Sequence, residues 1–265
     1  MCGRYVLKKE DLEALVQQFG VRSLEEFHSR YNIAPTSIVP LIRPLEFEGM
    51  PPPPPEDHIG DATPSSRSSI KRDESVASSA KVELTGVRWG LIPAWTKPDI
   101  PVRPLVNVRA ETLVTRFKGA LRHRRCVLPA SGFYEWEAVG SKKQPWFFGM
   151  RNSGPFALAG IWDTWRGGDG VVLETCAIIT TTPNGLLGRI HDRMPVLLTP
   201  EQAQTWVTAR DSKDAERLLA SAPDEAMVAI RVGPAVSNVR NDGPDCIAAA
   251  PDEPGDTEPQ LSLGF

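Results

Sequence analysis

The sequence predicts an α+β fold built mainly from short antiparallel strands. Four runs between residues 125 and 182 are rich in β-branched and aromatic residues, namely "RCVLPASGFYEWEAV", "QPWFFGM", "FALAGIWDTW" and "ETCAIITTT". Gly, Pro, Ser and Asn separate these runs, as is typical of an antiparallel sheet system. Helical periodicity is clear in two short stretches, so the helices are expected to be short and to flank the sheets.

The two predicted helices have recognisable ends. The first covers residues 11–20 and stops at Gly20, a common helix C-terminal residue. Its apolar face consists of Leu12, Leu15, Val16 and Phe19. The second covers residues 199–210, with Thr199 as the N-cap and Pro200 in the first turn.

Two segments lack the composition of a folded core. Residues 45–82 are rich in proline and serine and hold almost no large apolar residues, so burial cannot offset the entropy lost on folding. Residues 250–265 form an acidic, proline-broken tail. We therefore expect one domain over residues 2–249, interrupted by a disordered insertion at 45–82 and followed by a disordered tail.

Charge is divided unevenly between these parts. The whole chain carries a net charge of −3. Residues 1–44 and 83–241 hold 26 basic and 20 acidic residues, a net +6, whereas the rest of the chain is net −9. A basic core in a chain with seven tryptophans suits a polyanion that offers rings for stacking, and a mixed solvated surface explains +6 equally well.

Several classes of protein are excluded by what the sequence lacks. No apolar run approaches the roughly 20 residues that cross a bilayer, and the start of the chain is charged, so an intracellular, soluble protein is expected. The four cysteines and four histidines show no metal-ligand spacing, so no metal and no cofactor are expected. Cys126 and Cys176 lie in apolar runs and are expected to be buried and inert.

Cys2 is not covered by this expectation of a buried, inert thiol. Removal of Met1 would leave Cys2 with a free α-amine and a thiol on the same residue. The alternative is that a cysteine stands second by accident.

Six short motifs follow one another along the chain: "MCGR" at 1–4, "RYNIAPT" at 30–36, "WGLIPAW" at 89–95, "LVNVRAET" at 105–112, "GFYEWE" at 132–137 and "RIHDRMP" at 189–195. In this order the chain resembles the SOS-response-associated peptidase family over residues 2–44 and 83–249. The resemblance implies a barrel-like, β-rich core with a groove for single-stranded DNA. It also implies a protein that shields abasic sites in that DNA, with lyase and N-terminal autoprocessing peptidase activity as further expectations.

The chemistry of Cys2 fits such a substrate. An opened abasic sugar presents an aldehyde, and an α-amine with a pKa of about 8 is partly unprotonated at neutral pH, so it can form a Schiff base. The neighbouring thiol can then close onto the imine carbon. The product would be a five-membered thiazolidine that crosslinks protein and DNA.

The resemblance implies roles for three more residues. Glu135 would hold the N-terminal ammonium, accept its proton and help to dehydrate the carbinolamine, although a carboxylate on a strand is usually solvated. His191 would act as general acid and base on the sugar, with a structural histidine as the alternative. Asn107 would orient the opened sugar or the Cys2 thiol, with a turn-forming asparagine as the alternative.

The same motifs, together with "SNVRND" at 237–242, supply residues for the DNA strand. Four arginines are expected to bind phosphates, although any one of them could be a plain surface charge: Arg4, Arg109, Arg193 and Arg240. Asn32 is also expected at the DNA surface. Trp89 and Pro93 are expected to wedge or stack on bases, with core packing as the alternative for Trp89.

Two other functions remain open from the sequence. A chain that begins Cys-Gly after Met1 also resembles N-terminal nucleophile hydrolases, such as glutamine amidotransferases, in which the amine is the base for the thiol. A non-catalytic module that binds single-stranded or modified DNA would not need Cys2.

The tail ends in "QLSLGF", in which Gln260, Leu263 and Phe265 resemble peptides that dock on a replication sliding clamp. A C-terminal strand that packs on the domain is the alternative. The protein itself is expected to be a monomer.

Overall fold

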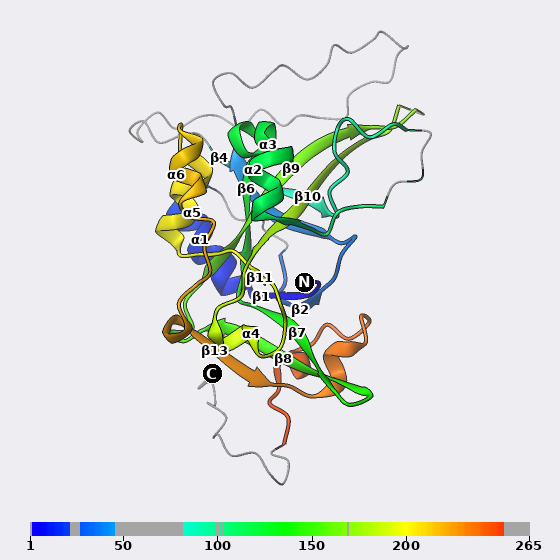
Figure 1. Cartoon of the computed structure of the whole chain (residues 1–265), viewed down its shortest axis with the longest axis vertical. Helices are drawn as coiled ribbons and strands as arrows, with labels where there is room; N and C mark the ends of the chain where they lie inside the picture. Colours follow the sequence, from blue (N-terminus) through cyan, green and yellow to red (C-terminus); the bar gives the residue numbers. More distant parts are fainter. Residues whose placement is uncertain are drawn as a thin grey trace.

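The computed structural model describes residues 2–21, 27–45, 82–98, 101, 103–168 and 170–251. The predicted α+β class is confirmed, because two antiparallel-rich sheets carry short helices on their outside (Figure 1). Most of the predicted insertion and tail lies outside the described residues, and the limits of the single domain stay a prediction.

Five strands close into a barrel. In ring order they are β3 (Ile38–Pro44), β6 (Arg125–Ala130), β9 (Phe156–Arg166), β10 (Val172–Thr181) and β4 (Val82–Trp89), and β4 pairs with β3 again. The β4–β10 pair is parallel, and the other four pairs in the ring are antiparallel. Three short strands add to this sheet: β5 (Asn107–Arg109), β11 (Met194–Pro195) and β12 (Leu197–Leu198).

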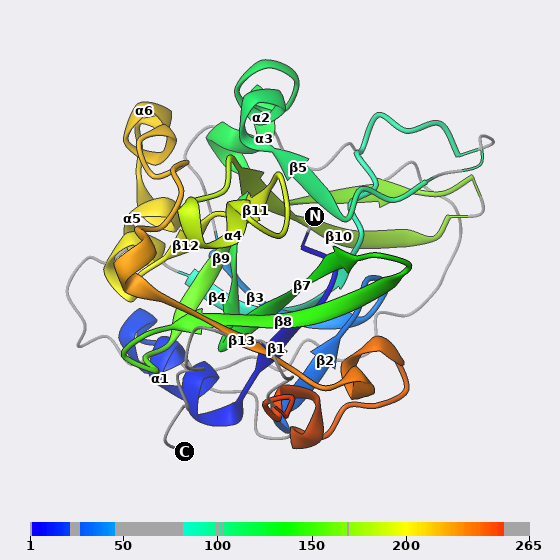
Figure 2. The same ribbon diagram turned by 60° about the horizontal axis from the view of Figure 1, so that its bottom comes forward.

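A second, five-stranded sheet lies against the barrel. Its order is β13 (Met227–Arg231), β8 (Lys142–Met150), β7 (Gly132–Val139), β1 (Tyr5–Leu7) and β2 (Arg30–Ile33). β7 and β8 form a long hairpin, and the chain enters β1 from between the two sheets (Figure 2). One core cluster accordingly joins Cys2 and Leu7 to the barrel residues Cys126 and Cys176.

The C-terminus of the first predicted helix and the N-terminus of the second follow local sequence rules, whereas the first helix begins at Lys9 and not at residue 11. α1 (Lys9–Phe19) buries the four expected apolar residues and ends at Gly20, whose φ of 65° a glycine adopts without strain. α5 (Pro200–Thr208) begins with a capping box at Thr199. The other helices are α2 (Ala110–Arg116), α3 (Lys118–His123), α4 (Gly185–Gly188) and α6 (Ser212–Glu216). Single 3-10 turns cover Asp224–Ala226, Pro234–Ser237 and Pro244–Ile247.

The ends of the predicted insertion are adjacent in space. Strands β3 and β4 pair continuously from Ile38 opposite Arg88 to Pro44 opposite Val82. With a rise of about 3.4 Å per residue, these two ends of the ladder lie roughly 20 Å apart. The insertion therefore leaves the barrel at the end of the β3–β4 hairpin that is distant from Trp89.

Candidate active site

Cys2 lies three residues before the start of β1 and is fully buried between the two sheets. The Asn107 side chain donates a hydrogen bond to the Cys2 carbonyl at 2.9 Å, so β5 of the barrel fixes the start of the chain. The Cys2 thiol makes a weak contact of 3.9 Å with the Arg4 carbonyl. Burial raises the pKa of this thiol, and the charge of Glu135 raises the pKa further, so the sulfur is a neutral thiol at pH 7.

The side-chain oxygen of Asn107, Oδ1, is buried and makes no hydrogen bond within the part of the chain that the structure describes. A buried acceptor of this kind is unusual in a folded protein and costs free energy. A hydroxyl or amine of a bound substrate could satisfy it.

Glu135 lies on the inner face of β7. Strand alternation places it, as expected, on the face opposite Tyr134 and Trp136, which pack in a separate cluster. Glu135 is 3% exposed, and this burial raises the pKa of its carboxyl group, while the charge of His191 partly opposes the rise. A carboxyl group with a raised pKa is suited to take up and release a proton near neutral pH.

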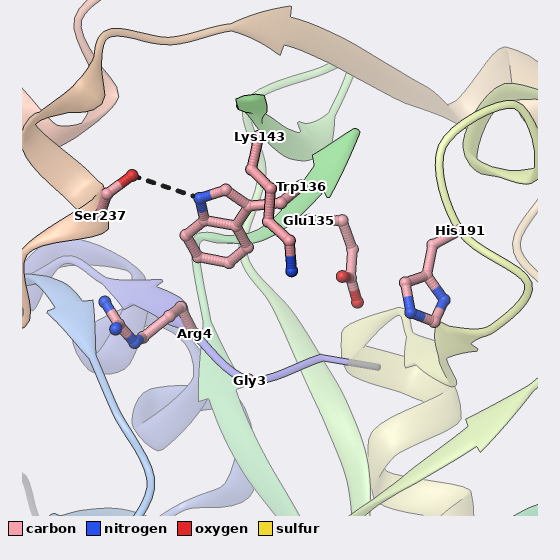
Figure 3. Close-up of a pocket in the computed structure, with 7 residues that line it drawn as sticks. All are labelled: Gly3, Arg4, Glu135, Trp136, Lys143, His191 and Ser237. Atoms are coloured by element: carbon pink, nitrogen blue, oxygen red, sulfur yellow. Dashed lines mark hydrogen bonds between the residues drawn. The ribbon is translucent and has the colours of Figure 1, made fainter. Parts of the chain in front are cut away.

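His191 lies on the loop that follows α4. Its backbone N–H donates to the Leu187 carbonyl at 3.0 Å, which ties this loop to the helix. The Nδ1 atom of the ring lies 2.9 Å from an Asp192 carboxylate oxygen and 3.0 Å from the Arg193 backbone nitrogen. In Figure 3 the Glu135 and His191 side chains point toward one another across a pocket.

This pocket has a volume of about 530 Å³. Its lining consists of Gly3, Arg4, Glu135, Trp136, Lys143, His191 and Ser237 (Figure 3). The Arg4 guanidinium lies over the Trp136 ring at 5.8 Å and donates to the Val236 carbonyl. The pocket thus combines two cationic side chains, one buried carboxyl group and one imidazole, and its volume lies in the range of small-molecule sites.

Three lining residues were missed from the sequence. Trp136 follows Glu135 directly, and Lys143 pairs with Ala138 across the β7–β8 hairpin, so both could have been found by pairing these two strands. Ser237 accepts a hydrogen bond from the Trp136 indole at 3.3 Å. It comes from a segment about a hundred residues further along the chain, and no local pattern marks it.

Besides Arg4, the predicted phosphate-binding arginines divide into two groups. Arg109 and Arg240 are exposed. Arg193 is 8% exposed, and its guanidinium forms two hydrogen bonds of 2.9 Å with the Glu111 carboxylate and one of 2.7 Å with the Thr180 carbonyl. These donors of Arg193 therefore point at protein, and a phosphate would have to compete with Glu111.

Asn32 likewise has partners inside the protein. It is 1% exposed, its amide nitrogen lies 2.8 to 3.1 Å from three backbone carbonyls of residues 236–241, and its Oδ1 accepts from Arg4. This network holds the segment after β13 against β2. Contact of Asn32 with DNA stays a prediction.

The aromatic residues of "WGLIPAW" have different environments. Trp89 is fully buried, donates to the Val106 carbonyl at 2.9 Å and packs edge-on against Tyr5, which favours the core alternative. Pro93 is also buried. Trp95 is 65% exposed, although its ring lies 5.4 Å from that of Phe117. Trp95 therefore offers a ring face for stacking that Trp89 does not.

The described residues contain no group of three His, Cys, Asp or Glu side chains that could hold a metal ion. They also contain no helix of the length and apolar character that crossing a membrane requires. Cys126 and Cys176 are fully buried, as expected.

Comparison with known proteins identifies the family. A family model described as SOS response associated peptidase (SRAP) matches residues 1–239. The chain is 32% identical over 255 residues to the abasic site processing protein YoqW of Bacillus subtilis, over 93% of this chain and 99% of that protein. It is 32% identical over 210 residues to the abasic site processing protein HMCES of Gallus gallus, over 69% of this chain and 61% of that protein. A crystal structure of a protein from Bacteroides thetaiotaomicron has the same fold, with a TM-score of 0.72 at 22% identity, over 94% of this chain and all of the other. The chain belongs to the SOS response associated peptidase family.

Proposed function

We propose that this protein recognises abasic sites in single-stranded DNA and forms a covalent crosslink to them through Cys2. The observation that carries the proposal is the convergence of four residues that are far apart in the sequence. Asn107 donates a hydrogen bond to the Cys2 carbonyl. Glu135 and His191 face one another across the pocket, which is also lined by Gly3, the neighbour of Cys2. The names of the relatives YoqW and HMCES, which describe abasic site processing, support the same substrate.

The reaction begins with the amine of Cys2 after removal of Met1. Its lone pair attacks C1′ of the opened sugar, and loss of water from the carbinolamine gives an imine. The Cys2 sulfur then adds to the imine carbon, and the thiol proton ends on the ring nitrogen. Because burial keeps the thiol neutral, the amine reacts first and the sulfur closes the thiazolidine afterwards.

Glu135 and His191 divide the proton transfers. The Glu135 carboxylate accepts a proton from the ammonium of Cys2 and returns it to the departing hydroxyl of the carbinolamine. His191 donates a proton to the sugar ring oxygen during ring opening and removes one during reversal. The raised pKa of Glu135 suits this role, since the group exchanges its proton more readily at neutral pH than an exposed glutamate would.

The proposed DNA surface consists of cationic side chains and one exposed aromatic ring. Arg4 and Lys143 face the pocket, and Arg109 and Arg240 are exposed. Trp95 lies on a loop that Asp163 fixes by accepting a hydrogen bond of 2.8 Å from the Ala94 N–H, so its exposed ring can stack on a base without ordering the loop anew.

Incubation with single-stranded DNA that carries one abasic site tests the proposal. Intact mass first establishes whether Met1 is absent. We expect an adduct that survives denaturation, no adduct with intact DNA, and none with Cys2→Ala. Cys2→Ser should give at most a weak Schiff base, and a heat-stable adduct at full yield from this variant would contradict the thiazolidine.

Two alternatives predict different results. An N-terminal nucleophile hydrolase would turn over a glutamine or peptide substrate many times, whereas the crosslink is nearly stoichiometric. A non-catalytic DNA-binding module would retain full affinity and show no adduct, with or without Cys2. Lyase and autoprocessing peptidase activities are compatible with the crosslink, and they are measured as strand cleavage and as self-removal of Met1.

A further partner is proposed for the tail. Gln260, Leu263 and Phe265 lie outside the described residues, and their clamp-like pattern rests on sequence alone. Deletion of residues 260–265 should abolish binding to a replication sliding clamp and leave crosslinking intact. No binding by the full chain at tens of micromolar, the weak end of useful peptide affinity, would contradict this role.

A further inference from the structure

A buried arginine connects two segments of the site that lie far apart in the sequence. Arg193 follows His191 by two residues, and its guanidinium donates hydrogen bonds of 2.9 Å to both carboxylate oxygens of Glu111. A third bond, of 2.7 Å, goes to the Thr180 carbonyl. A charge-assisted pair with two parallel hydrogen bonds fixes direction as well as distance. Two residues that are 82 positions apart are therefore held in one geometry.

Each end of this connection leads to a residue of the site. Glu111 lies in the first turn of α2, which continues directly from β5, the strand that carries Asn107. Asn107 in turn donates to the Cys2 carbonyl. At the other end, the Arg193 backbone N–H donates to Nδ1 of His191 at 3.0 Å. The pair thus joins the segment that holds Cys2 to the residue that contacts the His191 ring.

The strand ladders stop before they reach His191. β10 pairs with β5 at Thr180 opposite Arg109, and it pairs with β11 at Thr180 opposite Pro195. His191 precedes β11, and its backbone N–H is bonded to a carbonyl of α4. The Arg193 side chain adds a link from the end of this loop, residues 189–193, to α2 and β10.

The Glu111 end of the pair is charged and reachable by solvent. Hydrogen bonds from Arg193 hold the pKa of the Glu111 carboxyl group below its usual value, so the group is ionised at neutral pH. The Glu111 side chain is 59% exposed, so water screens the pair and its loss should cost little global stability. A substitution at Glu111 can therefore be studied in folded protein.

We propose that Glu111 is a positioning residue that acts through Arg193 and holds the loop of residues 189–193, with His191, in place relative to Cys2. This inference rests on the proposed function. Crosslinking needs the Cys2 amine, the sugar and the His191 ring in one arrangement, and a displacement of about 1 Å can cost up to about a hundredfold in rate. Glu111 itself touches no substrate, and Arg193 serves the protein and not a DNA phosphate.

The first experiment separates the crosslinking rate from the affinity for DNA, in protein that lacks Met1. Glu111→Gln should slow adduct formation at saturating abasic DNA about fivefold, which equals about 1 kcal/mol, the upper end for pairs with an exposed partner. Affinity for intact single-stranded DNA should change less than about twofold at physiological ionic strength, where exposed charges are screened. Asp214→Asn breaks an exposed pair with Arg217 at α6 and is the matched control, which should change neither quantity.

A different role for the same pair predicts the opposite pattern. If Glu111 only occupies the Arg193 fork until a DNA phosphate replaces it, Glu111→Gln would strengthen binding of intact DNA severalfold and would not slow crosslinking. Arg193→Gln would then make the dependence of log affinity on log salt shallower by about 0.7. Either result would overturn the positioning role, as would an unchanged crosslinking rate in Glu111→Gln.

A double-mutant cycle tests whether the two residues act as one unit. Glu111→Gln, Arg193→Gln and the double variant are compared at a temperature at which all three are folded. The double variant should crosslink about as slowly as Arg193→Gln alone, whereas independent effects would multiply and contradict the inference. Glu111→Asp keeps the charge and should restore part of the rate. If Arg193→Gln does not fold, the two Glu111 variants still decide the question.

A measurement without DNA distinguishes failure of the inference from failure of the proposed function. In Glu111→Gln the amide of Arg193, which is bonded to His191, should exchange its hydrogen severalfold faster. The amide of Tyr134, which donates to the Arg4 carbonyl, should exchange as in wild type. Unchanged exchange at Arg193 would overturn the inference. Absence of any adduct from wild-type protein lacking Met1 would instead reject the proposed function.

Discussion

Replacement of Asn32 by alanine should lower the free energy of unfolding by about 3 kcal/mol, even though Asn32 lies in a motif expected to bind DNA. The side chain is 1% exposed, and its amide nitrogen faces the carbonyls of Val236, Asn238 and Asn241 at 3.1, 3.0 and 2.8 Å. These bonds fasten the segment after β13 to β2. The segment also carries Ser237, which lines the pocket.

The magnitude follows from which partners lose their hydrogen bond. The Val236 carbonyl keeps a donor, because Arg4 also donates to it at 3.0 Å. The Asn238 carbonyl loses its donor, and the Asn241 carbonyl retains a weak contact of 3.6 Å with the Cys246 thiol. An unsatisfied buried polar group costs about 1 to 3 kcal/mol, and the lower half of that range applies to these partly buried carbonyls. Two such groups give the expected loss of about 3 kcal/mol.

Urea unfolding followed by tryptophan fluorescence measures this loss, and crosslinking is measured at a temperature where the variant is folded. Asn32→Asp is an informative companion, since it places a carboxylate against three carbonyl oxygens and should cost more stability than alanine. The folded alanine variant should crosslink within a few-fold of wild type. A stability loss below about 1 kcal/mol, together with a tenfold fall in affinity for DNA, would refute the internal role and assign Asn32 to the DNA surface.

Three other substitutions test the site. Lys143→Gln should make the dependence of log affinity on log salt shallower by about 0.7, whereas Lys213→Gln on α6 should not, and equal slopes would remove Lys143 from the DNA surface. Trp95→Ala should weaken binding of intact single-stranded DNA by about 1 to 3 kcal/mol in fluorescence anisotropy. Trp89→Ala should instead cost about 3 to 5 kcal/mol of stability, and a reversal of these two effects would contradict the assignment. Because burial raises the pKa of Glu135, the folded state binds its proton more tightly than the unfolded chain, so the ionised carboxylate lowers stability at neutral pH. Glu135→Gln should therefore raise the melting temperature at pH 7, and the gain should shrink as the pH falls toward the ordinary value near 4.5; a gain that grows toward low pH would contradict this sign.

The helix ends were predictable from the sequence, whereas the closure of the five strands into a barrel was not. Gly20 and Thr199 mark helix ends by rules that involve only neighbouring residues, and the structure confirms both. The barrel closes through the parallel pair of β4 with β10, which joins residues 88–89 to 175–176. No periodicity within either strand reports such a distant partner. The barrel was expected because of the resemblance to a family, and the residues alone indicated an antiparallel sheet system.

The site shows a similar division. Alternation along "FYEWE" correctly separated Glu135 from its aromatic neighbours, since strand geometry alone decides the face. The sequence could not distinguish an arginine that faces solvent from one paired inside the protein. Arg109 is exposed, whereas Arg193, which also lies in one of the polar motifs, is paired with Glu111. The same motif also contained Asp192, whose contact with the His191 ring became evident only from the structure.

The position of the site explains why its polar groups can be buried without unfolding the protein. Cys2 and Glu135 lie where the barrel meets the second sheet, and both sheets contribute hydrophobic residues around them. The free energy that burial of Glu135 costs is offset by the packing of the hydrophobic residues around it. In the proposed reaction, water exclusion would favour loss of water from the carbinolamine and would strengthen the interaction between Glu135 and the ammonium of Cys2. The burial of Glu135 that suits the proposed reaction thus also lowers the stability of the folded protein, as is common for residues that are selected for function.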